Sequence, residues 1–288
     1  MIRTFKDNPK KKKIRDIDDF FIQEEFMHHK KKLKYFGLPS EGLYDIQQWD
    51  EYIGDIIAVE RGSRSEPVSK QSLLMTNAFL LEYHSRLLLL RGDIFEIILN
   101  DEDNHGKKIP YPFELINLDY GGSILYPDRK RILALKKLID CQVPNDFLLL
   151  ITANSREFDE DELLNTQKRI LAELYLNEDI QNKFKNFLEW INSKKSIHRQ
   201  IMHLNYLLKC DAEVKHYNIE CKPPTIYENE HHTLIHYIYK FRFDKLATTK
   251  ITSKQTILDI LKIEILKLEN GNLRSIKSFK DFLKDKEI

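Results

Sequence analysis

The sequence predicts an α/β fold in which a mostly parallel sheet carries helices on both faces. From Leu33 onward, short apolar runs alternate with longer amphipathic segments, which is the pattern of consecutive βα units. Near residue 235 the apolar period changes to two, which is typical of a strand whose side chains alternate between two faces. We therefore expect a parallel sheet that ends in a late antiparallel hairpin.

Five short runs are expected to form the parallel strands. Each is rich in leucine or β-branched residues and is bounded by Gly, Pro, Asn or Asp, which favour turns. The segments between them have lengths that suit crossover helices. The expected strands are 33–36, 56–60, 86–90, 113–118 and 147–153, and the expected helices are 44–52, 69–84, 94–99 and 129–141.

The second half of the chain departs from this alternation. Leucine, isoleucine and phenylalanine recur at helical spacing in 159–175, 178–192 and 196–209. A period-two strand follows, with Tyr237, Tyr239 and Phe241 on one face, and it is expected to pair with a strand at 214–220 across a loop at 221–232. Amphipathic helices are predicted at 257–268 and 275–283.

These patterns suggest one elaborated domain with five parts. They are a basic N-terminal extension with a short helix (1–31), a cofactor-binding α/β core (32–158), a helical insertion (159–212), a C-terminal hairpin of the sheet (213–246) and C-terminal helices (247–288). The 288 residues, 42% of them hydrophobic, are enough to bury a substantial core.

Composition excludes several classes of protein. The formal charge of +1 means that any polyanion site must be a local patch. The three cysteines, Cys141, Cys210 and Cys221, are far apart, which argues against a disulfide framework or a zinc site. His231, His232 and His236 lack an obvious further ligand, so no metal is expected. Because the start is polar and no long apolar run occurs, we expect a soluble cytoplasmic protein.

Acidic residues follow three of the expected strands. Glu60 ends IIAVE, Asp93 follows RG after the third strand, and Asp119 lies in FELINLDYGG. In open α/β sheets ligands bind at the carboxyl ends of the strands, where such carboxylates can accept hydrogen bonds. Local roles are equally open at this point: Glu60 pairing with a nearby arginine, Asp93 capping the helix at Ile94, and Asp119 capping the turn at Gly121 and Gly122.

In order and spacing, these motifs resemble the class I S-adenosylmethionine-dependent methyltransferases, which have a Rossmann-like sheet, over about residues 33 to 246. The resemblance implies S-adenosylmethionine as cofactor. It implies that Glu60 accepts from the ribose hydroxyls, that Asp93 accepts from the adenine amino group and that Ile94 packs on the ring. The family's first glycine loop is similar to YFGLPSEGLYDI, which brings Phe36 and Gly37 to the cofactor, although Pro39 and the spacing to Gly42 are nonstandard.

The stretch NLDYGG resembles the fourth motif of methyltransferases that act on amino groups of nucleic-acid bases. The resemblance implies catalytic roles for Asp119, as acceptor for the nucleophilic nitrogen, and for Tyr120, as a ring that stacks on the base. The proline usual in that motif is absent between them. NLDYGG followed by LLLITAN is also similar to tRNA guanine-N2 methyltransferases.

Three functions follow from these observations. One is methyl transfer to an amino group of a nucleic-acid base, for which two lysine runs are the natural phosphate contacts. A second is a binding or assembly role without catalysis, with a protein partner on the helices of 159–212. A third is methyl transfer to a small molecule or protein. The lysine runs are Lys10, Lys11, Lys12 and Lys13, and Lys30, Lys31 and Lys32. No membrane partner is expected.

Overall fold

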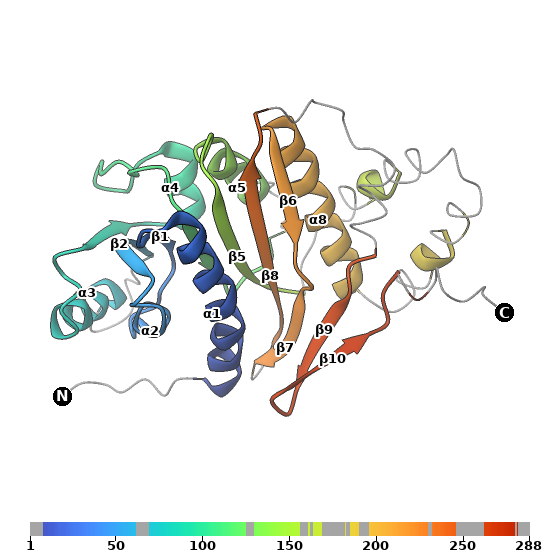
Figure 1. Cartoon of the computed structure of the whole chain (residues 1–288), viewed down its shortest axis with the longest axis horizontal. Helices are drawn as coiled ribbons and strands as arrows, with labels where there is room; N and C mark the ends of the chain where they lie inside the picture. The colour runs from blue at the N-terminus through green and yellow to red at the C-terminus, as the bar shows by residue number, and fades with distance from the viewer. Residues whose placement is uncertain are drawn as a thin grey trace. The chain divides into compact units, whose positions relative to one another are not determined.

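The computed structural model describes residues 8–61, 69–124, 130–155, 161, 164–168, 182, 185–189, 196–229, 232–245, 262–279 and 281 (Figure 1). The chain divides into two compact units. Unit 1 comprises Met1–Tyr120 and Leu133–Ile151, and unit 2 comprises Gly121–Ile132 and Thr152–Ile288.

Unit 1 contains a parallel sheet in the order β3-β2-β1-β4-β5. Strand β1 runs parallel to both β2 and β4, and β2 runs parallel to β3. The Leu148 amide donates to the Glu114 carbonyl at 2.9 Å near the start of β5 and β4, so these two strands begin at the same edge. The predicted Rossmann-like sheet is thereby confirmed. Its strands are β1 (Leu33–Gly37), β2 (Ile53–Glu60), β3 (Leu87–Arg91), β4 (Leu115–Asp119) and β5 (Phe147–Asn154), the last shared with unit 2.

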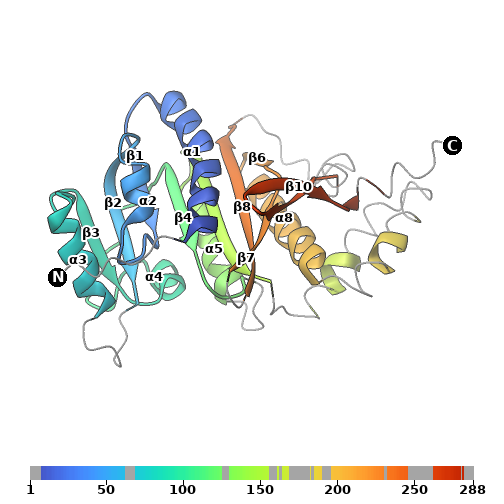
Figure 2. The ribbon, with the colours of Figure 1, turned by 90° about the horizontal axis from the view of Figure 1, so that it is seen from below.

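The helices of unit 1 cover both faces of this sheet. From β1 the chain moves outward through α2 (Tyr44–Gln48) and α3 (Lys70–Leu80), and it returns through α4 (Ile94–Asn100) and α5 (Lys130–Asp140). Because right-handed crossovers in opposite directions place their helices on opposite faces, the two pairs lie on different sides (Figure 2). In agreement, Lys137 of α5 donates to the Leu99 carbonyl of α4 at 2.8 Å.

The N-terminal segment is a long helix rather than a short one between basic tethers. Helix α1 (Pro9–His29) begins after Asn8, whose side chain accepts from the Lys10 amide at 2.9 Å. It packs against β1 and α2, and it buries Ile14 and Ile22. The apolar face of α1 is therefore part of the core, and the division of the chain after residue 31 stays a prediction.

Unit 2 is built around β8 (His232–Phe243), which is antiparallel to β6 (Tyr217–Cys221) and to β7 (Thr225–Asn229). The last residues of β5 are also antiparallel to β8, because Ser155 donates to Thr233 at 3.1 Å and the Thr152 hydroxyl lies 2.8 Å from His236 Nδ1. The predicted late antiparallel pair is confirmed. The expected loop at 221–232 is wrong in part, since it contains β7.

The helix expected at 257–268 was wrong where the structure describes it, because residues 265–268 lie in a strand. Of the helix expected at 275–283, residues 279 and 281 are helical, and residues 275 and 276 lie in a strand. β9 (Ile265–Glu269) and β10 (Asn272–Ile276) form an antiparallel hairpin, and β9 also pairs with β7 in parallel. The turn contains Asn270 and Gly271, both with positive φ, and Asn-Gly is the strongest short hairpin signal. Residues 246–261 lie outside the described part of the chain.

Helix α8 (Ser196–Val214) confirms the third helix expected in the second half of the chain. Most of the other two expected ranges, 159–175 and 178–192, lie outside the described residues. Within the residues that are described, no helix combines the length and apolarity needed to cross a bilayer.

Candidate functional site

The candidate site lies where the strand order of unit 1 reverses, at the carboxyl ends of β1 and β4. Gly37 at the end of β1 is in register with Ala58 of β2 on one side and with Asn117 of β4 on the other. In open parallel sheets this switch point is where ligands bind, because the flanking connections diverge to opposite faces. The carboxyl ends of β2 and β3 reach the same edge.

Asp119, the last residue of β4, forms an ion pair with Lys11 in the first turn of α1. The two side chains are 24% and 35% exposed, so the pair is neither deeply buried nor fully solvated. Burial lowers the pKa of Lys11, but the Asp119 carboxylate outweighs it, so the pKa ends above its ordinary value. The side-chain amine of Lys11 therefore lies at Asp119, the residue predicted from the sequence to accept from a substrate nitrogen.

A second carboxylate, Asp45, lies beside this pair and was missed by the sequence reasoning. It belongs to the first turn of α2, and its Oδ2 accepts from Asn117 Nδ2 at 2.9 Å. Its Oδ1 lies 3.4 Å from Arg15 Nη1 of α1. The pKa of Asp45 is raised to about 7, mainly by burial and then by the Asp119 charge, while the charges of Arg15 and Lys11 oppose the shift. The sequence signal was an aspartate directly after the loop that follows the first strand.

Tyr35 and Gly37 share the face of β1 that looks toward these groups. The Tyr35 hydroxyl is buried beside the Asn117 side chain. A Cβ atom at Gly37 would lie 2.1 Å from the Asn117 carbonyl oxygen and 2.8 Å from the Tyr35 hydroxyl. Only glycine allows this close approach of β1 to β4.

Phe36, which was expected to contact the cofactor, has its side chain in the core. It is fully buried, and its ring stacks on Phe113 with centroids 4.8 Å apart. Neighbouring residues of a strand point to opposite faces, so Phe36 cannot share the face of Tyr35 and Gly37. Any contact of Phe36 with a ligand at this edge would have to come from its backbone.

Glu60 and Asp93 stand at adjacent strand ends of the same edge. Glu60 ends β2 in register with Arg91 of β3, and its side chain is partly buried. Asp93 Oδ1 accepts from the amides of Phe95 and Glu96 at 3.1 and 3.3 Å, which makes Asp93 the N-cap of α4. Its Oδ2 lies 3.9 Å from Arg61. The capping role is therefore confirmed for Asp93, and Ile94 is buried as the first residue of α4.

Tyr120 directly follows Asp119 and is partly exposed. The ring packs edge to face against Phe95 of α4, with centroids 4.9 Å apart and an interplanar angle of 82°. Phe95 itself is buried. The core therefore holds in place the aromatic ring that was predicted to stack on a substrate.

The two lysine runs lie at opposite ends of α1. Lys10, Lys12 and Lys13 are exposed on its first turn, where a positive helix end makes further positive charge unfavourable. Lys30, Lys31 and Lys32 follow its last turn, and Lys31 pairs with Glu114 at 2.6 Å. Since 21 residues of helix span about 30 Å, only the first run is close to Asp119.

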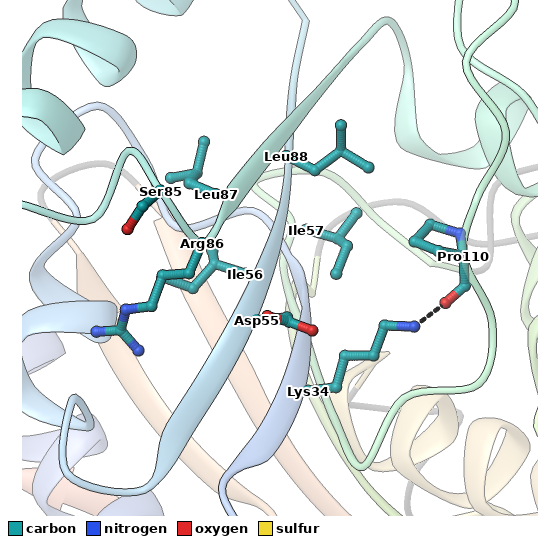
Figure 3. Close-up of a pocket in the computed structure, with 9 residues that line it drawn as sticks. All are labelled: Lys34, Asp55, Ile56, Ile57, Ser85, Arg86, Leu87, Leu88 and Pro110. Atoms are coloured by element: carbon teal, nitrogen blue, oxygen red, sulfur yellow. Dashed lines mark hydrogen bonds between the residues drawn. The ribbon is translucent and has the colours of Figure 1, made fainter.

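A hollow of ≈ 320 Å³ lies at the opposite edge of the sheet (Figure 3). It is lined by Lys34 of β1, residues 55–57 of β2, residues 85–88 at the start of β3, and Pro110. Lys34 donates to the Pro110 carbonyl there, and the Arg86 side chain points away from Lys34. Because this is the amino edge, the hollow is separate from the candidate site.

Metal ligation finds no support in the described residues, where no group of three or more potential ligand side chains is suitably arranged. His236 is buried against the Thr152 hydroxyl, and His232 is exposed. His231 lies outside the described residues.

No protein-family profile and no curated protein matches the chain. Several solved structures do, at low similarity. An O-methyltransferase from Bacillus cereus in complex with SAH is 9% identical, with 84% of each chain covered and a TM-score of 0.45. Trm1 from Pyrococcus horikoshii with S-adenosyl-L-methionine is 12% identical over 95% of this chain and 64% of its own, with a TM-score of 0.45. At such values neither residue roles nor substrates carry over.

Proposed function

We propose that this chain is an S-adenosylmethionine-dependent methyltransferase whose reacting centre lies at the carboxyl ends of β1 and β4. The observation that carries the proposal is the strand order β3-β2-β1-β4-β5 with a polar acceptor, Asp119, at the switch point. An acidic residue, Glu60, ends the neighbouring β2. This is the arrangement that the sequence resemblance implies for the family.

The residues at this edge fit the cofactor in part. Glu60 offers the two accepting oxygens that a ribose diol requires. Asp93 fits less well, because Oδ1 already caps α4. We therefore assign ribose binding to Glu60, and the loop after Gly37 would hold the methionyl part through its backbone.

When bound, the cofactor supplies a methyl group on a positively charged sulfur, and the protein's task is mainly alignment. Asp119 would accept an N–H of the target amine and keep the nitrogen lone pair directed at the methyl carbon. Tyr120 would provide an aromatic ring for the substrate, and its packing against Phe95 would hold that ring in place.

The substrate that best fits this site is an amino group of a nucleic-acid base. Exposed Lys10, Lys12 and Lys13 lie on the helical turn that carries Lys11 to Asp119. Phosphates bound by these lysines would bring a neighbouring base toward Tyr120, where an aromatic ring can stack on it. The total charge of +1 makes this local cluster the relevant electrostatic feature.

The alternative is a binding or assembly protein that no longer transfers methyl groups. Two observations favour it: Asp93 is used as a helix cap, and Asp119 is paired with Lys11. Both groups would have to change partners during methyl transfer.

Calorimetric titration with S-adenosylmethionine and S-adenosylhomocysteine distinguishes the two functions. For the methyltransferase we expect both to bind, with dissociation constants between about 1 μM and 1 mM. Glu60→Gln should weaken binding about tenfold, because a charged acceptor is lost. Glu82→Gln, at an exposed position away from this edge, is the matched control. Absence of binding heat with both compounds would leave only the binding or assembly role.

A further inference from the structure

Lys11 differs from the lysines beside it. Lys10, Lys12 and Lys13 are exposed, whereas the Lys11 side chain turns inward and pairs with Asp119. Its ammonium group therefore occupies the place that the proposed function gives to a target amine. The contact joins the first turn of α1 to the end of β4, and both belong to unit 1.

The Lys11 amine also has the chemistry of a target. It is a primary amine at the end of an unbranched chain, and the acceptor that would position a substrate nitrogen already holds it. We propose that Lys11 is itself a methyl acceptor, so that the protein methylates its own first helical turn. This inference rests on the proposed methyltransferase function and adds a modification site to it.

The reaction balances without a further reagent. The Lys11 ammonium releases one proton to solvent, and the freed lone pair attacks the methyl carbon of S-adenosylmethionine. The carbon–sulfur bond breaks with its electron pair on sulfur. The products are N-methyl-lysine, the neutral thioether S-adenosylhomocysteine and one proton.

Two physical effects act on the rate in opposite directions. Asp119 holds Lys11 in its charged form, which disfavours the free lone pair. A positively charged sulfur nearby would disfavour the ammonium and promote proton release. Because acceptor and amine are in one chain, no encounter is needed, and well-oriented intramolecular reactions gain large effective molarities. We therefore expect slow methylation. Its rate should rise about tenfold for each pH unit, as long as most of the Lys11 side chain is in the ammonium form.

The competing interpretation is that the ion pair only fastens α1 to the sheet. A partly exposed pair of this kind contributes little to stability. Under that interpretation Lys11 would remain unmodified in the presence of the cofactor.

In the test, the whole chain is incubated with S-adenosylmethionine, and its intact mass is followed over time. Peptide mapping after cleavage at glutamate then locates any added methyl group. We expect the gain of a methyl group at Lys11, with Lys12 and Lys13 unmodified. The rate per molecule should not depend on protein concentration. Lys11→Arg should abolish the gain, and Lys107→Arg, at an exposed lysine elsewhere, should not.

A second measurement needs no cofactor. With an amine-acylating reagent, Lys11 should react at least about tenfold more slowly than Lys12 or Lys13, because its lone pair is protonated and shielded by Asp119. Asp119→Asn should raise the reactivity of Lys11 toward that of its neighbours. Melting curves of Asp119→Asn and Lys11→Arg show whether these two variants fold.

The outcomes separate the two proposals. Absence of S-adenosylmethionine binding overturns both. Binding with an unmodified Lys11, methyl groups spread over Lys10 to Lys13, or a rate that grows with protein concentration overturns self-methylation alone.

Discussion

Asn117 of β4 donates its side-chain amide to Asp45 of α2 across 2.9 Å, directly beside the ion pair of Asp119. The other oxygen of Asp45 lies 3.4 Å from Arg15 of α1. One buried carboxylate thus links a strand and two helices at the switch point of the sheet. Its protonation state affects both the stability of unit 1 and the charge of the candidate site.

Asp45 should make the folded protein less stable as the pH rises from 5 to 8. Burial, Asp119 and Asp18 together raise its pKa to about 7, against the opposing charges of Arg15 and Lys11. Because this pKa lies above the unfolded value, the folded state binds the proton more tightly. The stabilisation present below the unfolded pKa is lost as the pH rises to about 7.

Urea unfolding of the wild type and of Asp45→Asn at pH 5 and pH 8 measures this effect. The fall in unfolding free energy should be larger in the wild type by about 3 kcal/mol, two pH units at about 1.4 kcal/mol each. Asp55→Asn, at an exposed position, should follow the wild type. Parallel pH curves for wild type and Asp45→Asn would contradict the prediction.

Replacement of Asp119 by Asn should separate binding from turnover. An acceptor that aligns the target nitrogen acts mainly in the transition state, so we expect turnover to fall about 100-fold or more. Affinity for S-adenosylmethionine should change by less than about threefold, and stability by at most about 1 kcal/mol. A methyl-transfer assay with calorimetry and thermal melts on one preparation measures all three. Lower stability with unchanged turnover would reject the catalytic role.

The two lysine runs provide a matched test of nucleic-acid binding. Replacing Lys10, Lys12 and Lys13 by Gln should weaken binding of a single-stranded oligonucleotide, and it should reduce the salt slope by about 0.7 for each phosphate that is no longer neutralised. The same change at Lys30, Lys31 and Lys32 removes equal charge about 30 Å away and should have little effect. Fluorescence anisotropy over a salt series measures the slopes, with RNA and DNA as separate arms. Equal weakening in both variants would indicate nonspecific attraction.

Gly37→Ala should be strongly destabilising. The added Cβ would lie 2.1 Å from the Asn117 carbonyl oxygen, and a strand backbone cannot move aside without disturbing the pairing of β1 and β4. We expect a loss of about 2 kcal/mol or more, as for other overpacked sites. Gly121→Ala, where nothing lies within 4 Å, should change stability by less than about 0.5 kcal/mol. Denaturant midpoints of the two variants measure the difference.

The sequence predicted the five parallel strands because buried strands of a parallel sheet read as continuous apolar runs. The prediction failed at α1, because the lysine-rich first turn of this helix resembles a solvated tether. It also failed at β9, because the spacing of Ile265 and Leu268 fits a helix as well as a strand. Among the site residues, Glu60, Asp93 and Asp119 could be placed at one edge of the sheet, because each lies at or just after the end of an expected strand. Asp45 and the pairing of Lys11 with Asp119 were not foreseen, because the partners are distant along the chain and no local pattern encodes such pairings.

The division of β5 limits how this protein can be dissected. Its first five residues belong to unit 1 and its last three to unit 2, and unit 1 is itself made of two separate stretches of chain. A gene fragment that stops after Tyr120 would keep Lys11 and Asp119 but would lack the fifth strand of their sheet. Activity lost in such a fragment would therefore report a broken fold, and single-residue exchanges in the whole chain are the informative route.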